Sequence, residues 1–468
     1  MRTRISVIGT GYLGATHAAC MAELGFEVLA VDNDPDKISL LSRGVVPFSE
    51  PELDDLVARH VASGRLRFTT DLQEAAELAD VHFVCVGTPQ SRDGLAADVS
   101  AVYDVTRRLA ELSTRDCLIV GKSTVPVGTT EQLTALAQSA AQPGVTPTVA
   151  WNPEFLREGH GVQDTLRPDR LVFGVTAPDQ ELTLRRLYRR PIGEGVPVHV
   201  TDPATAELAK VAANAFLATK ISFINALAEV SDHAGADVVA LADVLGDDSR
   251  IGRRFLDAGV GFGGGCLPKD IRAFAARAAE LGAESVPALL AEVDAINLRA
   301  RTGVVDLAER LCGGSVEGLR LAVLGAAFKP LSDDVRDSPA LAVARQMYDR
   351  GAEVRVYDPA ASNNARWVAP ALTYVASSDA ALAGADLVIH LTEWPEFAEI
   401  EPQHAAALVR EQRIIDGRNR LDADRWRRAG WSFHGVGRGG SSVPARLDRP
   451  RPVPAATRPD RQTMLEQT

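Results

Sequence analysis

The sequence predicts an α/β protein in which two doubly wound domains are joined by a long central helix and a helical region. Residues 1–202 and 301–437 alternate short apolar, β-branched runs with helical stretches. Strands this apolar are buried on both faces, as in a parallel sheet covered by crossover helices. Residues 203–300 are helical in pattern almost throughout. A chain of 468 residues is long enough for two or three such domains.

The strands of the first domain are expected at ISVIG, EVLAVD, VHFVCVG, CLIVGKS, TPTVAWN, RLVFGV and PVHV. From Pro203 to about Gly235, apolar residues recur at helical spacing without a proline after the first turn, which predicts one long helix that bridges lobes or forms a dimer seam. A smaller second sheet is expected at RLAVLG, EVRVYD, DLVIHLT and RIIDG. Residues 438–468 are rich in Arg, Pro, Ser and Ala, so we expect a disordered tail.

The composition excludes several classes of function. Lys and Arg number 50 against 62 Asp and Glu, and the net charge of -12 would repel a phosphate backbone, so no nucleic acid partner is expected. We see no apolar run long enough to cross a bilayer and no signal peptide, which predicts a cytoplasmic protein without a membrane partner. The five cysteines are widely spaced and free of C-x-x-C pairs, so neither disulfides nor a metal site is expected.

A dinucleotide-binding turn follows the first predicted strand. Gly9, Gly11 and Gly14 form G-x-G-x-x-G before a helix, and Asp32 ends the second strand at the distance of a ribose-binding acid. Such glycines let the backbone approach a pyrophosphate at a helix N-terminus. A carboxylate at Asp32 accepts from a ribose 2′-hydroxyl and would repel a 2′-phosphate, which favours NAD over NADP. The alternative is a glycine turn that serves tight packing alone.

Further cofactor contacts are expected where the strands end, because ligands of open α/β sheets bind beyond the carboxyl ends of the strands. Gly87, Thr88 and Pro89 follow one apolar run, and Ser123 and Thr124 follow the next. We expect these residues to line the cofactor. Plain strand-ending turns are the alternative.

The segment FGGGCLPKD contains a candidate nucleophile. Cys266 lies two residues before Pro268, a residue favoured in the first turn of a helix. Helix N-termini and cations such as Lys269 lower the pKa of a thiol, which predicts a reactive thiolate. Asp270, one turn further on, is placed to exchange protons beside the sulfur. A buried free cysteine beside a glycine loop is the alternative.

Two polar residues share one face of the long predicted helix. Lys210 and Asn214 are separated by one turn. An ammonium and an amide that point to one place would stabilise an alkoxide or an oxyanion. A solvated lysine with a neighbouring asparagine explains the same spacing.

Several motifs resemble, in order, those of the UDP-glucose 6-dehydrogenase family within the nucleotide-sugar dehydrogenases: GTGYLG, GTP, KSTVPVG, NPEFLREG, AKVAANAFLATKISFINALAE, FGGGCLPKD, AFKPLSDDVRDS and DGRN. The resemblance runs from residue 3 to about residue 436. It implies an N-terminal NAD-binding Rossmann domain (1–202), a central helical dimerisation domain (203–300), a C-terminal Rossmann-like UDP-sugar-binding domain (301–437), and a homodimer or higher homo-oligomer. One departure is Gly265, where many relatives have Ser or Tyr.

The resemblance also implies roles for individual residues. Cys266 would be the nucleophile, Lys210 and Asn214 would stabilise oxyanions, and Asp270 would assist proton transfer. Glu154 and Thr124 match positions for placing water and for acid–base work. The implied cofactor contacts are Gly9, Gly11, Tyr12, Leu13, Gly14, Asp32, Lys37, Thr88, Thr124, Glu158, Lys269 and Arg336. The implied UDP-sugar contacts are Glu154, Phe155, Leu156, Lys210, Asn214, Phe255, Phe262, Gly263, Phe328, Lys329 and Arg418, with Arg250 of the partner subunit.

The implied activity is the four-electron oxidation of UDP-glucose to UDP-glucuronate with two NAD per sugar. A first hydride transfer gives an aldehyde, which Cys266 traps as a thiohemiacetal; a second leaves a thioester, which water hydrolyses. The stretch TLRPDRLVFG looks closer to the UDP-glucose branch. Dehydrogenases of GDP-mannose or of UDP-N-acetylhexosamines, a two-electron dehydrogenase without a thiol, and a silent nucleotide-binding protein are the alternatives.

Overall fold

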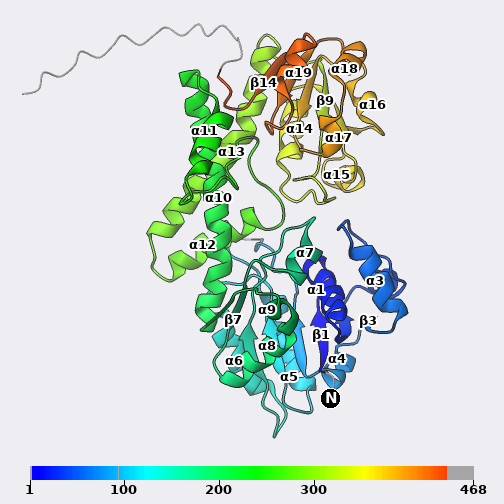
Figure 1. The fold of residues 1–468 in the computed structure, drawn as a ribbon, viewed down its shortest axis with the longest axis vertical. Helices are drawn as coiled ribbons and strands as arrows, with labels where there is room; N and C mark the ends of the chain where they lie inside the picture. The colour runs from blue at the N-terminus through cyan, green and yellow to red at the C-terminus, as the bar shows by residue number, and fades with distance from the viewer. Residues whose placement is uncertain (1–2, 93, 440–468) are drawn as a thin grey trace, which may run out of the picture.

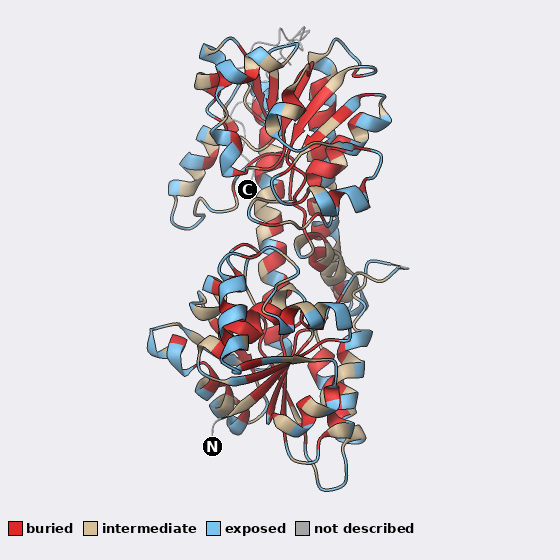
Figure 2. Cartoon of the chain, turned by 90° about the vertical axis from the view of Figure 1, so that its right-hand side faces the viewer, coloured by how far each residue is buried: buried red, intermediate tan, exposed pale blue. Residues whose placement is uncertain are grey.

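In the computed structural model, which describes residues 3–92 and 94–439, the chain forms two lobes connected by long helices (Figure 1). Each lobe is built around one sheet, and Figure 2 shows that the central strands of both sheets are buried. This is the predicted fold class of two doubly wound domains with a central helical region. Of the predicted tail, only Arg438 and Gly439 are among the described residues.

The N-terminal sheet has eight strands in the order β3-β2-β1-β4-β5-β6-β7-β8. The strand order reverses between β1 and β4, which is where a doubly wound sheet binds its ligand. All neighbours pair in parallel except β6 and β7, which are antiparallel. The strands are β1 (Arg4–Ile8), β2 (Glu27–Val31), β3 (Leu66–Thr69), β4 (Val81–Val84), β5 (Leu118–Gly121), β6 (Thr148–Trp151), β7 (Leu171–Gly174) and β8 (Val198–Thr201).

Helices cover both faces of this sheet and enclose one apolar core on each side. One core includes residues of α1, α3 and α8, and the other includes residues of α4, α5 and α6. The helices of this lobe are α1 (Tyr12–Glu23), α2 (Pro35–Ser42), α3 (Leu53–Ala62), α4 (Leu72–Leu78), α5 (Ser100–Leu112), α6 (Thr129–Ala140), α7 (Gly161–Leu166), α8 (Pro178–Leu187) and α9 (Arg189–Gly193).

The predicted long helix is confirmed as α10 (Pro203–Ala234). The Asp202 side chain caps its N-terminus by accepting from the Thr205 N–H, Pro203 occupies the first turn, and Gly235 ends it in a left-handed conformation with φ 71°. By length and composition α10 could cross a membrane, so the expectation that no apolar run is long enough for this was wrong. Its buried side contacts α12, α13, β6 and β7, as expected of a core helix.

Three further helices complete the central region: α11 (Val238–Asp247), α12 (Leu267–Glu280) and α13 (Ser285–Leu311). Because α13 runs without a break through residue 300, it belongs to both the central region and the C-terminal lobe, whose core it joins through residues such as Val304 and Val305.

The C-terminal sheet is parallel throughout, in the order β11-β10-β9-β12-β13-β14. Its strands are β9 (Arg320–Leu324), β10 (Glu353–Tyr357), β11 (Thr373–Tyr374), β12 (Leu387–His390), β13 (Arg413–Asp416) and β14 (Ser432–Gly435). Its helices are α14 (Pro339–Asp349), α15 (Ser362–Val368), α16 (Ser378–Leu382), α17 (Pro395–Ala398), α18 (Pro402–Leu408) and α19 (Ala423–Arg428).

Candidate active site

The glycine-rich turn between β1 and α1 has the shape that a dinucleotide needs. Gly9 has a φ of 92°, and a β-carbon there would come within 2.9 Å of the backbone of residues 85 and 86. A β-carbon on Gly14 would overlap the Gly9 carbonyl, so this glycine lets α1 pack against the turn. No described atom lies within 4 Å of a β-carbon built on Gly11. Packing therefore explains Gly9 and Gly14, whereas the open backbone at Gly11 fits a pyrophosphate.

Asp32 follows β2 and lies next to this turn. Its carboxylate accepts from the Thr10 N–H at 2.7 Å and from the Thr10 hydroxyl at 2.9 Å, and it pairs with Lys37 at 3.2 Å. Burial opposes ionisation, but the hydrogen bonds outweigh it and lower the pKa of Asp32. The carboxylate is therefore charged, as recognition of a ribose diol requires, and it disfavours a 2′-phosphate.

Tyr12 ties the glycine turn to a second loop. Its hydroxyl donates to Glu50, a buried carboxylate that also accepts from the N–H groups of Gly159 and Gly161, each at 2.6 Å. Burial and the Glu50 carboxylate raise the pKa of Tyr12. Sequence analysis did not predict Glu50, because Tyr12 lies 38 residues before it and Gly159 and Gly161 lie 109 and 111 residues after it, so no local pattern indicates these contacts. The adjacent Leu13 lies half-buried in α1.

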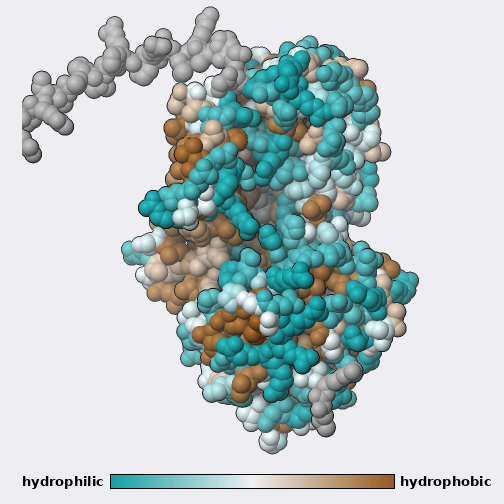
Figure 3. Space-filling view, viewed as in Figure 1, coloured by the Kyte–Doolittle hydropathy of each residue, from teal (hydrophilic) through white to brown (hydrophobic). Residues whose placement is uncertain are grey.

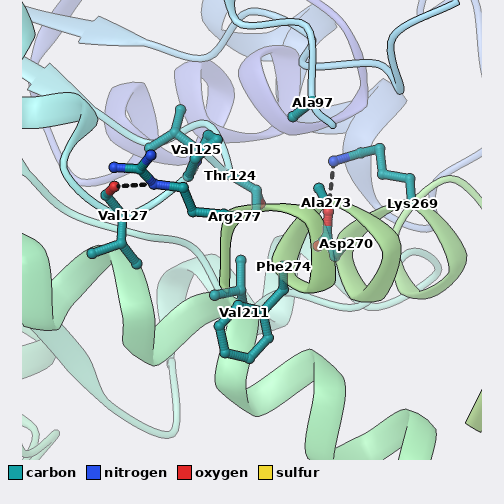
Figure 4. Close-up of a pocket in the computed structure, with 11 residues that line it drawn as sticks. Ala97, Thr124, Val125, Val127, Val211, Lys269, Asp270, Ala273, Phe274 and Arg277 are labelled. Atoms are coloured by element: carbon teal, nitrogen blue, oxygen red, sulfur yellow. Dashed lines mark hydrogen bonds and ion pairs between the residues drawn. The ribbon is translucent and has the colours of Figure 1, made fainter. Parts of the chain in front are cut away.

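The loops after β4 and β5 meet beside α12. The Thr88 hydroxyl donates to the Thr124 carbonyl at 2.8 Å, and Lys269 approaches that hydroxyl at 3.5 Å. Ser123 fastens the second loop by donating to the Val86 carbonyl at 2.7 Å. In Figure 4, the Val127 carbonyl lies beside Arg277 of α12, which donates to it, and Lys269 pairs with Asp270 on the same helix. Gly87 and Pro89 are exposed on the first loop.

Two buried polar pairs connect α10 to its surroundings. Lys210 forms an ion pair with Glu154, which follows β6, at 2.8 Å. Asn214 donates to Asp270 of α12 at 2.7 Å, and Asp270 also pairs with Lys269 at 2.6 Å. Lys210 and Asn214 are only 5% and 8% exposed, so the reading of a solvated lysine and its neighbour is wrong.

The same carboxylates keep Lys210 charged. Burial alone would lower the pKa of Lys210, but Glu154, the Cys266 sulfur and Asp270 together raise it above its usual value. A protonated ammonium and an amide therefore lie one helical turn apart in a site with little water, where both are effective at stabilising negative charge on oxygen.

Cys266 is the N-cap residue of α12, as expected, and its side chain is accessible to solvent. The predicted low thiol pKa is wrong for the ligand-free protein. The atoms of both lobes around the sulfur displace bulk water, and this desolvation raises the pKa of Cys266 to about 11; Lys210 opposes the rise, whereas Glu154 and Asp270 add to it. Lys269 is engaged with Asp270 rather than with the sulfur. The other cysteines are free and buried or half-buried.

The three glycines before Cys266 lie directly against the C-terminal lobe. A β-carbon on Gly263 would overlap the Asp337 carbonyl, and one on Gly264 would come within 2.7 Å of the Phe328 ring. A β-carbon on Gly265 would overlap the guanidinium group of Arg336.

Arg418, in the loop after β13, fastens the same segment. It donates to the carbonyls of Leu391, Gly261 and Phe328 at 2.8, 3.0 and 3.1 Å. Arg418 therefore joins residues 261–265, the loop before Cys266, to the carboxyl edge of the second sheet.

Glu158 receives contacts from two cations of the C-terminal lobe. Lys329 donates to its carbonyl at 2.6 Å, and Arg336 approaches its carboxylate at 3.2 Å. Burial and the nearby Asp334 raise the pKa of Glu158 to about 7, against the effect of Arg336 and Lys329. These contacts are where the two lobes meet beside Cys266.

The remaining residues implied by the resemblance are distributed as follows. Phe155 lies against Lys210, whose ammonium is 5.7 Å from the ring centroid, and the Leu156 N–H donates to Glu154 at 2.7 Å. Phe262 is buried and Phe255 has a left-handed φ of 66°. Arg250 is exposed and paired with Asp248, away from the other site residues of its own chain.

Sequence analysis missed two side chains of α13 that hold the loop before Cys266. Asn297 accepts from the Phe262 N–H at 2.7 Å and donates to its carbonyl at 3.0 Å. Arg301 donates to the same carbonyl at 2.9 Å and pairs with Asp337 at 2.8 Å. Both lie on a helix of ordinary pattern, so nothing local distinguishes them.

Glu207 of α10 was also missed. Its carboxylate accepts from the N–H groups of Gly128 and Thr130, each at 2.7 Å, and so caps α6 and fixes the loop that carries Thr124. Among the residues described, no group of three or more His, Cys, Asp or Glu side chains is placed to hold a metal ion.

Three family models match the chain in order. The NAD binding domain of the UDP-glucose/GDP-mannose dehydrogenase family matches residues 3–192, its central domain residues 204–299, and its UDP binding domain residues 322–423. The chain belongs to this dehydrogenase family. It is an NAD-dependent oxidoreductase, and the lobe that carries Arg418 contains its UDP-binding domain.

Relatives match over nearly the whole chain. A UDP-glucose 6-dehydrogenase of Rhizobium meliloti is 40% identical, covering 93% of this chain and 99% of the relative, and one of Bacillus subtilis is 41% identical, covering 93% of each. Among solved structures, a UDP-glucose dehydrogenase from Pyrobaculum islandicum has a TM-score of 0.86 at 38% identity, over 93% of this chain and 98% of the other. A UDP-D-ManNAc dehydrogenase from Pyrococcus horikoshii has a TM-score of 0.81 at 28% identity, over 94% and 100%.

Proposed function

We propose that this dehydrogenase oxidises the C6 alcohol of UDP-glucose to the carboxylate, giving UDP-glucuronate, with Cys266 as covalent nucleophile. The observation that carries the proposal is the arrangement around the sulfur. Lys210 with Glu154 and Asn214 with Asp270 form two buried pairs, and the charges of Lys210, Glu154 and Asp270 all act on the Cys266 thiol. The identity of about 40% to UDP-glucose 6-dehydrogenases over the whole described length supports the choice of sugar.

NAD, when bound at the glycine turn, accepts the hydride in each of the two oxidations. The Lys210 ammonium and the Asn214 amide hold the negative charge that develops on the C6 oxygen. The Cys266 sulfur loses its proton and bonds to the aldehyde carbon, giving a thiohemiacetal. Loss of hydride and a proton leaves a thioester, and water then adds to the carbonyl and expels the sulfur as the thiol.

Glu154 and Asp270 serve the proton transfers and the placing of water. Glu154 is paired with Lys210, and Asp270 is held by Asn214 and Lys269, so each carboxylate is fixed beside a group that stabilises oxyanions. Thr124 lies on the loop that Glu207 fixes. Arg418, Lys329 and the Phe328 ring present a cationic and aromatic surface for the UDP part, next to the loop before Cys266.

We also propose that the protein is a homodimer formed through the outer face of α10, in which Arg250 of the partner subunit reaches the substrate. In the single chain, Phe216, Phe223 and Val230 are 66%, 53% and 60% exposed at seven-residue spacing, which places them on one side of the helix. Figure 3 shows apolar surface along this side of the central helices. Apolar patches of this kind mark protein interfaces. The cytoplasmic location stays a prediction from the sequence.

The proposed reaction is tested by counting the NADH formed per sugar. We expect two NADH per UDP-glucose and little turnover of UDP-N-acetylglucosamine, UDP-N-acetylmannosamine or GDP-mannose. A yield of one NADH per sugar with free aldehyde as product would refute the covalent mechanism. Preference for another nucleotide sugar would refute only the choice of UDP-glucose as substrate.

The nucleophile is tested with Cys266→Ser. We expect kcat to fall by about three orders of magnitude or more while UDP-glucose affinity stays within about threefold, because the sulfur makes and breaks bonds and contributes little to ground-state binding. Turnover close to that of the unaltered protein would refute the assignment.

A further inference from the structure

Lys122 is a buried ammonium that the proposed chemistry does not use. It follows β5, two residues before Thr124, and only 7% of it is exposed. No carboxylate among the described residues lies within ion-pair distance of its Nζ atom, which instead donates to the Asn152 side-chain oxygen at 3.1 Å and to the Asn152 carbonyl at 3.3 Å. Burying a charge without a carboxylate partner is costly, so a chain that keeps one gains something other than stability from it.

Asn152 connects Lys122 to the active site. It directly follows β6 and lies two residues before Glu154. Its side-chain oxygen also accepts from the Tyr188 hydroxyl at 2.7 Å, and its amide group donates to the Val172 carbonyl at 2.9 Å. Asn152 is 1% exposed and is held from several directions. The chain therefore leaves β6 in a fixed direction.

That direction determines where Glu154 lies. One of its carboxylate oxygens pairs with Lys210 at 2.8 Å and the other accepts from the Leu156 N–H at 2.7 Å. The turn from Asn152 to Glu154 is three residues long and contains Pro153, whose ring fixes φ, so a shift at Asn152 is transmitted to Glu154.

The surrounding charges keep Lys122 protonated at neutral pH. The titratable groups that face it are His17 of α1, Cys85 after β4, Tyr188 after α8, and the pair of Glu154 and Lys210. Burial lowers the pKa of Lys122 to about 8, Cys85 and Glu154 oppose that change, and Lys210 adds to it. Below this pH, the Glu154 carboxylate is attracted to the Lys122 ammonium as well as to Lys210.

We propose that Lys122 is a positioning residue for the oxidation: by holding Asn152 it fixes the turn that presents Glu154 to Lys210. This inference rests on the proposed role of the Glu154–Lys210 pair in the chemistry. Lys122 itself touches neither substrate nor cofactor in this scheme.

The test is a double-mutant cycle of Lys122→Met and Glu154→Gln in the full-length protein at pH 7. We expect Lys122→Met alone to lower kcat about 30-fold or more, with KM for UDP-glucose and NAD changed less than about threefold. In the Glu154→Gln background, adding Lys122→Met should lower kcat by less than about threefold. A kcat within about threefold of the unaltered protein, or effects that multiply, would overturn the proposal.

Tyr188→Phe is the matched control, because it removes the other donor to the Asn152 side-chain oxygen and keeps the ammonium. We expect kcat to fall less than about threefold, and a loss as large as that of Lys122→Met would show that the ammonium has no special role. Thermal melting reports folding of each variant. Where Lys122→Met does not fold, Lys122→Gln, which keeps a donor, is measured in the same cycle by the same criteria.

The cycle also separates this inference from the proposed function. Full activity of Glu154→Gln alone would show that the Glu154–Lys210 pair is not used in the chemistry. Loss of activity in Glu154→Gln together with full activity in Lys122→Met would overturn only the role of Lys122.

Discussion

The guanidinium group of Arg336 occupies the space that a side chain on Gly265 would fill. The same group pairs with Asp334 at 2.6 Å and approaches Glu158 of the other lobe at 3.2 Å. The absence of a side chain at Gly265 therefore leaves the space from which Arg336 contacts the other lobe. Gly265, the expected departure from the family pattern, therefore lies at the contact between the lobes.

Gly265→Ser should move Arg336 without disturbing the fold, because the overlapping atoms are the end of a long, flexible side chain. We expect KM for NAD to rise about fivefold, the size of one partly exposed ion pair, with the melting temperature changed by less than about 2 °C. Gly264→Ala is the contrasting variant, since φ is 86° and the Phe328 ring blocks the β-carbon. It should cost far more activity. An unchanged KM for NAD in Gly265→Ser would contradict the role given to Arg336.

The accessible thiol should react slowly at neutral pH. Because the pKa of Cys266 is about 11, the thiolate is the minor form at pH 7 and its fraction grows with pH. In the absence of NAD, the rate of alkylation of Cys266 by iodoacetamide should rise about tenfold per pH unit from pH 7 to 10. Mass spectrometry measures this rate. Lys210→Met removes the cation that lowers this pKa, so alkylation at pH 8 should slow. A rate that levels off near pH 7 would indicate a low thiol pKa.

Asp32 should decide the choice of cofactor. Asp32→Ala removes a charged acceptor from the ribose position, so we expect KM for NAD to rise about tenfold or more and the preference over NADP to shrink. Steady-state kinetics with both cofactors measures it. Lys37→Met is the control, because Lys37 is the partly exposed partner of Asp32 and its loss leaves the carboxylate in place. Equal discrimination in Asp32→Ala would show that other residues reject the 2′-phosphate.

The outer face of α10 should hold two subunits together. The double variant Phe216→Glu and Phe223→Glu places charge on this face, and we expect a monomer by light scattering coupled to size exclusion. Trp367→Glu is the matched control: Trp367 of α15 is 89% exposed but lies on the C-terminal lobe, so the oligomeric state should not change. If Arg250 acts across the interface, the monomer also loses UDP-glucose affinity. A dimer that survives the double variant would place the interface elsewhere.

The pattern of the sequence predicted most of the fold because most of its strands are short, apolar and buried. The expected burial was wrong for β8, an edge strand without a buried residue. All seven runs of the first domain and all four of the second are strands in the structure. The strands β3, β11 and β14 were not predicted. All three lie at sheet edges, and β3 and β11 are only partly buried, so these two lack the continuous apolar pattern of the central strands. The antiparallel pairing of β6 and β7 also leaves no trace in the composition of either strand.

The site was less accessible to prediction than the fold. Spacing placed Lys210 and Asn214 on one helix face but did not decide between a site and a solvated pair, and their roles came only from the family resemblance. Their buried partners, Glu154 and Asp270, lie in other parts of the chain. The predicted direction of the Cys266 pKa shift was wrong. The sequence shows the helix terminus, which lowers a thiol pKa, but it does not show the desolvation by both lobes or the surrounding carboxylates, which raise it. Asn297, Glu207 and Lys122 act through contacts of long sequence separation, which no local motif encodes.

The helix α10 carries Lys210 and Asn214 on its buried side and Phe216 and Phe223 on its exposed side. In the proposed dimer, the subunit contact and the chemistry would thus depend on the same helix. If the dimer forms as proposed, a substitution in the interface that bends α10 would displace the Lys210 ammonium. Catalysis would then limit which residues the interface can carry, even at positions that do not contact the substrate.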